Sequence, residues 1–310
     1  MRNSFAKDLE SMITRFPNLF LLYGDIGNKL FEDFKVANPQ NYCNVGVAES
    51  NLVTVAAGMA KTGFLPIVYT INSFLSLKTL EQIKLDVCYA NLPVVMVGTG
   101  GGLSYAELGA THHSLEDFAI LSVLPNLEVF APADSAELSQ CLELAFSLQK
   151  PSYIRIGKKG ETSFIEKNRE NAEFQGVNKI VFNSKSQNLI ISTGTIGGNV
   201  FSAIESIQTK SNLNFEFWTI PRVKKIPESE LTSIFTRFKK IIIVEEHNSF
   251  GGLGSIISYE NLVKYSGCIQ FKFLNTGDRF HSGLGNLDKA RAVLGLDTNS
   301  IKNSILDFFR

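Results

Sequence analysis

The chain has 310 residues, of which 44% are hydrophobic and 19% are charged. This length is enough for two domains of ordinary size, and the apolar share excludes a disordered chain because it can fill a core. Thirty Lys and Arg residues balance thirty Asp and Glu residues, so the net charge gives no reason to expect nucleic acid or an acidic membrane as a partner.

The N-terminal stretch MRNSFAKDLESMITRF is amphipathic and carries charges of both signs. It has the pattern of neither a signal peptide nor a membrane span, so we expect a cytoplasmic protein. The cysteines lie far apart and form no Cys-x-x-Cys pair, which predicts reduced, mostly buried thiols; a scattered metal set is the less favoured alternative. These cysteines are Cys43, Cys88, Cys141 and Cys268.

In the first half of the chain, short apolar runs alternate with helical patterns. The runs predict buried strands at residues 18–23, 65–70, 92–98, 127–131 and 153–156. Asp134 follows the fourth run and is a good N-cap for a helix over residues 135–149. Continuous apolar strands joined by crossover helices predict a parallel sheet that is covered on both faces.

The second half shows another α/β pattern after a polar stretch with little periodicity, residues 161–185, which we interpret as a linker. Apolar runs beyond it predict strands at 188–193, 215–220, 240–244 and near 269–274, and helices over about 197–208, from about 252, and over 301–309. The sequence therefore predicts an α/β protein with two α/β domains, residues 1–160 and residues 186–310.

Three features of the first domain follow predicted strands. Glu49 opens a helix, Phe74 follows the strand at 65–70, and a long loop over residues 98–114 ends near His112 and His113. Ligands of open parallel sheets gather at the carboxyl ends of the strands, and long loops there are often functional.

Taken singly, each feature has an ordinary explanation. Glu49 is a carboxylate favoured by the helix dipole, and Phe74 by itself is typical of a core. The loop's GTGGG is not a GxGxxG dinucleotide motif. His112 and His113 have no evident third ligand, so we expect no metal site on them.

In combination, these features resemble a known family. The chain is similar to the C-terminal half of transketolase and of 1-deoxyxylulose-5-phosphate synthase, a pyrimidine-binding domain followed by a C-terminal domain. The resemblance covers nearly all of the chain, and its motifs stand in order. The stretches that carry it are VGVAESNLVTVAAGMA, INSFLSLKTLEQIKLDV, GATHHSLEDFAILSVLPNLEVFAPAD, PSYIRIGKKG, ISTGTIGGNV, IIIVEEHNSFGGLGS and TGDRFHSGLG.

The resemblance implies thiamine diphosphate as the cofactor and a role for four residues. Glu49 is implied to hydrogen-bond N1′ of the cofactor's aminopyrimidine ring and so to act in catalysis. Phe74 is implied to stack on that ring. His112 matches the family's loop histidine near the substrate oxygen atoms, and Lys158 stands where transketolases carry an Arg for the substrate phosphate.

Three positions depart from the family pattern. Leu108 replaces the Asp that reads a substrate hydroxyl in the family, Leu77 replaces an Arg, and Lys158 binds phosphate without the bidentate geometry of Arg. These changes lead us to expect a donor or acceptor sugar other than xylulose 5-phosphate and ribose 5-phosphate.

One part of the family's machinery has no match. In these enzymes a Gly-Asp-Gly motif and a later Asn-Asn pair hold the diphosphate and Mg²⁺, and the nearest stretch here, Gly24-Asp25-Ile26-Gly27, lacks that pattern. We therefore expect the C-terminal subunit of a split transketolase, inactive alone, which transfers a two-carbon ketol unit between sugars. A separate N-terminal subunit is expected to supply the Mg²⁺ ligands in an α2β2 heterotetramer.

Two alternatives stay open. The β-subunit of a 2-oxo-acid dehydrogenase has the same two domains and also needs a partner, although the loop GATHHSLED is closer to transketolase. A non-catalytic binding subunit could keep the fold and lose the chemistry, although Glu49, Phe74 and His112 argue against it.

Overall fold

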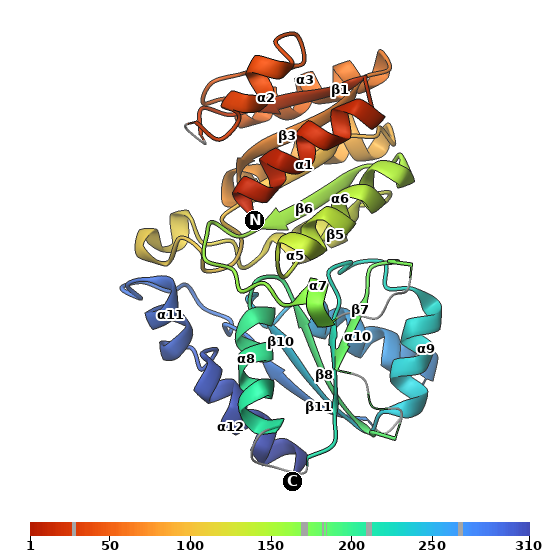
Figure 1. Ribbon diagram of the computed structural model, residues 1–310, viewed down its shortest axis with the longest axis vertical. Coiled ribbons are helices and arrows are strands. Elements are labelled where there is room, and N and C mark those ends of the chain that lie inside the picture. The colour runs from red at the N-terminus through yellow and green to blue at the C-terminus, as the bar shows by residue number, and fades with distance from the viewer. Residues whose placement is uncertain (27–28, 169–172, 182, 184, 209–212, 266–268) are drawn as a thin grey trace.

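A computed structural model describes residues 1–310 apart from 27–28, 169–172, 182, 184, 209–212 and 266–268. Within this part of the chain two sheets lie one above the other in Figure 1, each with its own helices. The α/β fold with two sheets therefore agrees with the prediction. No helix among the described residues is both long and apolar enough to cross a membrane.

The first sheet has six parallel strands in the order β2-β1-β3-β4-β6-β5. Side chains of β4 and β6 are buried throughout. Burial on both faces explains the apolar run of β4, whereas β6 also buries the polar side chains of Ser152 and Arg155. The strands are β1 (Leu19–Tyr23), β2 (Tyr42–Asn44), β3 (Leu65–Ile71), β4 (Val95–Thr99), β5 (Glu128–Phe130) and β6 (Ser152–Ile156).

Helices cover both faces of this sheet. Helices α1 and α6 lie side by side on one face (Figure 1) and bury residues such as Phe5 and Leu142, while α3 and η2 pack on the other. The helices are α1 (Arg2–Arg15), α2 (Glu32–Ala37), α3 (Glu49–Lys61), α4 (Leu80–Gln82), α5 (Asp117–Ser122) and α6 (Ser135–Leu148), with π-helices η1 (Phe74–Lys78) and η2 (Ile83–Tyr89) and the 3-10 helix η3 (Ala106–Thr111).

The second sheet has five strands in the order β11-β10-β8-β9-β7, of which β7 alone is antiparallel to its neighbour among the described strands. The strands are β7 (Asn178–Val181), β8 (Asn188–Thr193), β9 (Glu216–Thr219), β10 (Lys240–Glu245) and β11 (Gln270–Leu274). The helices are α7 (Ile165–Asn168), α8 (Gly197–Gln208), α9 (Glu228–Arg237), α10 (Leu253–Glu260), η4 (Asn261–Tyr265), α11 (Leu287–Val293) and α12 (Thr298–Phe309).

The two sheets share a hydrophobic core. One cluster of buried side chains contains Met96 and Phe118 from the first half of the chain together with Trp218 and Ile243 from the second. The halves are therefore packed against each other, and a side chain at their junction can be held from both sides.

The segment 161–185, which the sequence predicts to be a linker, carries structure. It contains α7 and the edge strand β7, and β7 pairs with β9. Asp134 helps to fix it, because one carboxylate oxygen caps α6 and the other accepts hydrogen bonds from the backbone N–H groups of Phe164 and Ile165, at 2.8 and 2.9 Å. The second sheet thus begins before the predicted boundary at residue 186.

Candidate functional site

The predicted site residues lie near one edge of the first sheet. Glu49 follows β2, Phe74 follows β3, the loop with His112 follows β4, and Lys158 follows β6. Because all of these strands are parallel, their carboxyl ends meet at the same edge, where ligands of such sheets usually bind.

Glu49 is the first residue of α3 and is only 4% exposed. No side chain caps this helix, so a carboxylate in its first turn is favoured by the helix dipole. Lys78 Nζ lies 2.6 Å from Glu49 Oε2, although the Lys78 side chain itself is 54% exposed. A buried carboxylate is costly without a partner, and Lys78 supplies one from the open side of the site.

Phe74 begins η1, the five-residue π-helix that ends at Lys78. Its half-buried ring lies against the imidazole of His112, with ring centroids 5.2 Å apart in an edge-to-face arrangement. Isolated π-helical turns are rare and often occur at functional sites. The turn therefore brings together the aromatic ring of Phe74 and, through Lys78, the carboxylate of Glu49.

Tyr105, which is not predicted from the sequence as a site residue, connects His112 with Lys158. Its ring centroid is 5.7 Å from that of His112, and Lys158 Nζ lies 4.6 Å from its centre. Gly100 makes room for the Tyr105 ring, because a Cβ at that position would overlap it. Phe74, His112 and Lys158 thus belong to one continuous set of contacts.

The two adjacent histidines have different surroundings. His112 is half-buried in contact with Phe74, and its Nδ1 lies 2.9 Å from Thr111 Oγ1. His113 is 4% exposed and hydrogen-bonds the carbonyl of Ala106 through Nε2 at 3.3 Å. Burial lowers the pKa of His113 below its ordinary value, which favours a neutral imidazole.

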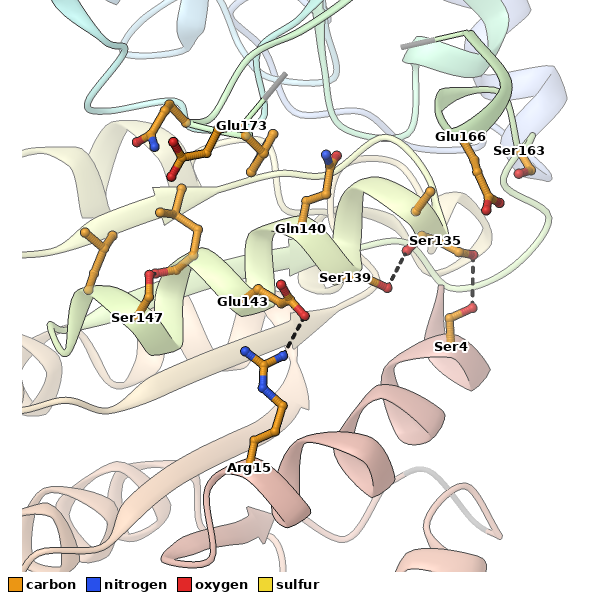
Figure 2. A pocket seen from close by; sticks show the side chains of 15 residues that line it. Ser4, Arg15, Ser135, Ser139, Gln140, Glu143, Ser147, Ser163, Glu166 and Glu173 are labelled. Carbon is orange, nitrogen blue, oxygen red and sulfur yellow. Dashed lines mark hydrogen bonds and ion pairs between the residues drawn. The ribbon is translucent and has the colours of Figure 1, made fainter. Parts of the chain in front are cut away.

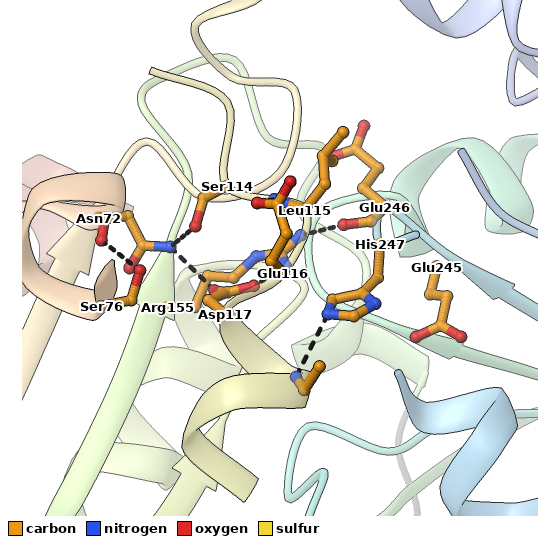
Figure 3. Close-up of polar contacts among 12 residues, drawn as sticks. Asn72, Ser76, Ser114, Leu115, Glu116, Asp117, Arg155, Glu245, Glu246 and His247 are labelled. Atoms are coloured by element: carbon orange, nitrogen blue, oxygen red, sulfur yellow. Dashed lines mark hydrogen bonds and ion pairs between the residues drawn. The ribbon is translucent and has the colours of Figure 1, made fainter. Parts of the chain in front are cut away.

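A buried ion pair lies behind the loop, at the junction of the two sheets. Arg155 on β6 donates to Asp117 at 3.0 Å and to the backbone carbonyl of Glu246 at 2.8 Å, as Figure 3 shows. Its guanidinium also stacks 4.4 Å from the ring centre of Phe118. Through Arg155, the second half of the chain is thus linked to Asp117, the first residue of the helix that follows the loop bearing His112.

Two of the positions that depart from the family pattern are exposed. Leu77 and Leu108 are 51% and 52% exposed. The cation beside Leu77 is Lys78, which faces Glu49. Lys78 is not predicted from the sequence because the residue that the resemblance compares with an Arg is Leu77, three positions after Phe74, whereas Lys78 is the fourth.

Among the described residues, no three His, Cys, Asp or Glu side chains lie together in a way that could hold a metal ion. Asp25 accepts a hydrogen bond from Asn44 Nδ2 at 3.3 Å, and Gly27 lies outside the described residues.

Cys88 and Cys141 are buried free thiols, Cys43 is exposed, and Cys268 lies outside the described residues. Burial raises the pKa of Cys88 to about 12.

A polar cavity of about 910 Å³ lies elsewhere, along α1 and α6 (Figure 2). Serines line much of it, and Arg15 is paired with Glu143 at 2.8 Å. It includes none of Glu49, Phe74, His112 and Lys158.

Comparison with known proteins shows which family the chain matches. Residues 1–160 match the family described as "Transketolase, pyrimidine binding domain". The chain is 30% identical to a putative transketolase C-terminal section of Methanocaldococcus jannaschii, over 99% of this chain and 95% of that protein. It is 29% identical to one of the subunits of apulose-4-phosphate transketolase from Actinobacillus succinogenes, over 85% of this chain and 83% of that protein.

Longer relatives and a solved structure complete the comparison. The chain is 30% identical to 1-deoxy-D-xylulose-5-phosphate synthase of Halothermothrix orenii, of which it spans 42%. A solved split-gene transketolase, described as an inactive beta4 tetramer, matches with a TM-score of 0.85 over 99% of this chain and 97% of that one, at 23% identity. This structural match shows that the two chains share a fold over their whole length.

Proposed function

The chain belongs to the transketolase family, and from this membership we propose that it is the C-terminal subunit of a split, thiamine diphosphate-dependent transketolase. Its reaction is the transfer of a two-carbon ketol unit between sugars or sugar derivatives. The observation that carries the proposal is the meeting of a buried carboxylate, Glu49, with the turn that bears Phe74, next to His112.

The residues present fit the aminopyrimidine half of the cofactor. Glu49 offers a carboxylate that can share a proton with ring atom N1′, and Phe74 offers an aromatic face for packing against a flat heterocycle. When bound, thiamine diphosphate supplies the nucleophilic carbon and the electron sink that cleavage next to a carbonyl group requires. Lys78 must move away from Glu49 or share its carboxylate when the ring arrives.

In this proposal, His112 and Lys158 hold the substrate. His112 can donate to or accept from a sugar oxygen, and the Lys158 ammonium can attract a phosphate as a point charge. The contact between Phe74 and His112 supports a position for His112 between the proposed cofactor and substrate regions.

The diphosphate and Mg²⁺ belong, in this proposal, to a separate N-terminal subunit. The relatives named as a transketolase subunit and as a C-terminal section align with most of their length, whereas this chain spans 42% of the longer synthase. We propose that two copies of each subunit form an α2β2 assembly. Residues 1–160 would form the pyrimidine-binding domain, and the second sheet would form the C-terminal domain.

The sugars are proposed to differ from the xylulose 5-phosphate and ribose 5-phosphate pair. Leu108 offers no acceptor for a substrate hydroxyl, and Leu77 offers no charge for a phosphate. A deoxy sugar, an amino sugar or a nucleotide-linked sugar fits such a pocket. One relative is named for apulose 4-phosphate, which supports an unusual sugar. The relatives' names favour a transketolase over a 2-oxo-acid dehydrogenase.

Reconstitution tests the proposal. The chain is expressed alone and together with the product of an adjacent gene that encodes a diphosphate-binding domain. Mass and thiamine diphosphate-dependent ketol transfer are measured for both samples. We expect an α2β2 mass and activity only for the pair, and full activity of the chain alone would overturn the proposal.

A further inference from the structure

The side chain of Asn72 joins the segments that bear Phe74 and His112. Asn72 lies between β3 and η1, two residues before Phe74, and is fully buried. Its Nδ2 donates to Ser114 Oγ at 2.6 Å and to Asp117 Oδ2 at 2.8 Å, as Figure 3 shows. Ser114 in turn lies two residues after His112.

The remaining polar atoms of this group are also used. Asn72 Oδ1 accepts a hydrogen bond from the hydroxyl of Tyr153 on β6, and that hydroxyl also lies 2.6 Å from Asp117 Oδ2. Gly98 on β4 makes room for the amide, because a Cβ there would overlap the Asn72 side chain. A buried polar network in which every member has a partner rigidifies its surroundings.

We propose that Asn72 is a positioning residue that fixes the Phe74 turn against the His112 loop, an inference that rests on the proposed function of this site. Asn72 and Ser114 are both buried, at 0% and 1% exposure, so neither can touch a substrate. Asn72 acts through Phe74 and His112, whose relative placement decides whether cofactor and substrate meet in a reactive geometry.

The second half of the chain supports these hydrogen bonds of Asn72 to Ser114 and Asp117. Asp117, which accepts from Asn72, is held by Arg155, and Arg155 donates to the backbone carbonyl of Glu246. The backbones of Gly102 and Ser114 exchange two further hydrogen bonds, at 3.0 and 3.1 Å, which fix one end of the loop. The hydrogen bond from Asn72 to Ser114 then fixes the position of this end of the loop relative to Phe74.

The test compares Asn72→Ala with a matched buried asparagine outside the site. Asn178 on β7 donates to Glu137 at 2.8 Å and to Gln140 at 3.0 Å, so Asn178→Ala removes the same number of donated hydrogen bonds as Asn72→Ala. Four quantities are measured for each: the thermal midpoint, backbone amide exchange over residues 106–114 in the isolated chain, and both thiamine diphosphate affinity and turnover in the reconstituted pair. Hydroxypyruvate serves as the ketol donor, and turnover is followed as its thiamine diphosphate-dependent consumption, which does not depend on the choice of acceptor sugar.

We expect Asn72→Ala to speed amide exchange in residues 106–114 and to lower kcat by about 10- to 100-fold, since a small misplacement of reacting groups costs about that much. Asn178→Ala should lower the thermal midpoint by a similar amount, with exchange in residues 106–114 and kcat unchanged. Because Asn72 acts by holding Ser114, the double variant Asn72→Ala/Ser114→Ala should lose no more kcat than Asn72→Ala alone.

The inference is overturned if Asn72→Ala matches Asn178→Ala in loop exchange and kcat, or if the two changes are additive in kcat. If Asn72→Ala fails to fold, Ser114→Ala is judged by the same criteria, because it removes the hydrogen bond between Asn72 and Ser114. Absence of thiamine diphosphate-dependent turnover in the unmodified pair refutes the proposed function instead, and the exchange measurement on the isolated chain then decides whether these hydrogen bonds fix the loop.

Discussion

Lys78 Nζ lies 2.6 Å from Glu49 Oε2, and the two side chains differ sharply in burial, at 54% and 5% exposure. A charge in the interior is thus neutralised by a cation that reaches in from the surface. Because Lys78 and Phe74 share one π-helix, the conformation of this turn influences both the carboxylate and the aromatic face of the proposed cofactor site.

Replacing Lys78 tests the role of this ion pair. Lys78→Met leaves the Glu49 carboxylate without its partner and should destabilise the isolated chain by about 1 kcal/mol, a value kept low because Lys78 is half-exposed. Urea unfolding measures the effect, with Lys84→Met on η2 as a control. If the ion pair is the cause, adding Glu49→Gln should abolish most of the loss, and an equal loss in Lys84→Met would contradict the explanation.

Replacing Phe74 separates cofactor binding from catalysis. Phe74→Ala removes the aromatic face and should weaken thiamine diphosphate binding to the reconstituted pair by about tenfold or more, with a smaller effect on turnover at saturating cofactor. The exposed Tyr89 provides the control Tyr89→Ala. Unchanged affinity in Phe74→Ala would show that the ring does not face the cofactor.

The pH dependence of stability should reflect Glu137, a fully buried carboxyl in α6. Burial raises the pKa of Glu137 to about 7, although the hydrogen bonds that the carboxylate accepts from Ala133, Asn178 and Thr219 act to lower it. Because the folded state then holds a proton that the unfolded state has lost, the free energy of unfolding should fall as pH rises from about 4.5 to about 7, by up to about 1.4 kcal/mol per pH unit. Urea unfolding between pH 5 and 8 measures this slope, and Glu137→Gln should flatten it. An identical slope in Glu137→Gln would assign the effect to other groups, such as Glu245, whose pKa burial also raises to about 7.

The substrate proposal predicts a gain of function. Introducing Leu108→Asp, Leu77→Arg and Lys158→Arg together should raise kcat/KM for xylulose 5-phosphate and ribose 5-phosphate by about tenfold or more. Each change introduces the residue type that the family uses to bind a hydroxyl or phosphate group of these sugars. Steady-state kinetics on the reconstituted pair measure this. Ordinary transketolase efficiency with this sugar pair before any substitution would show that the substrate proposal is wrong.

Much of the fold could be predicted because its strands are continuous apolar runs between clear turn residues. The predicted strand at 188–193 and helix over 197–208 coincide with β8 and α8, and Asp134 caps α6 as expected. β4 begins at Val95, three residues after the start of the predicted strand at residues 92–98. β7 was not predictable from pattern, since it is a four-residue strand with polar residues whose pairing with β9 depends on a distant segment.

The candidate site divides in the same way. Glu49, Phe74, His112 and Lys158 follow from a resemblance over the whole chain, and the last three belong to one set of contacts. Lys78, Tyr105 and Asn72 have no sequence signal of their own. Their contacts depend on the π-helical turn, on the space left by Gly100 and Gly98, and on side chains far along the chain.

The most direct test of the account is cofactor-saturated turnover of Glu49→Gln in the reconstituted pair, with the thermal midpoint measured beside it. The substitution keeps the shape of the side chain and a hydrogen-bonding group but removes the carboxylate that is proposed to share a proton with the cofactor. We predict a loss of about 100- to 10,000-fold in turnover, with a much smaller change in cofactor affinity. If Glu49 served only the helix terminus and its ion pair, stability would fall by about 1 kcal/mol and activity would survive. Near-normal turnover in Glu49→Gln would therefore contradict the account.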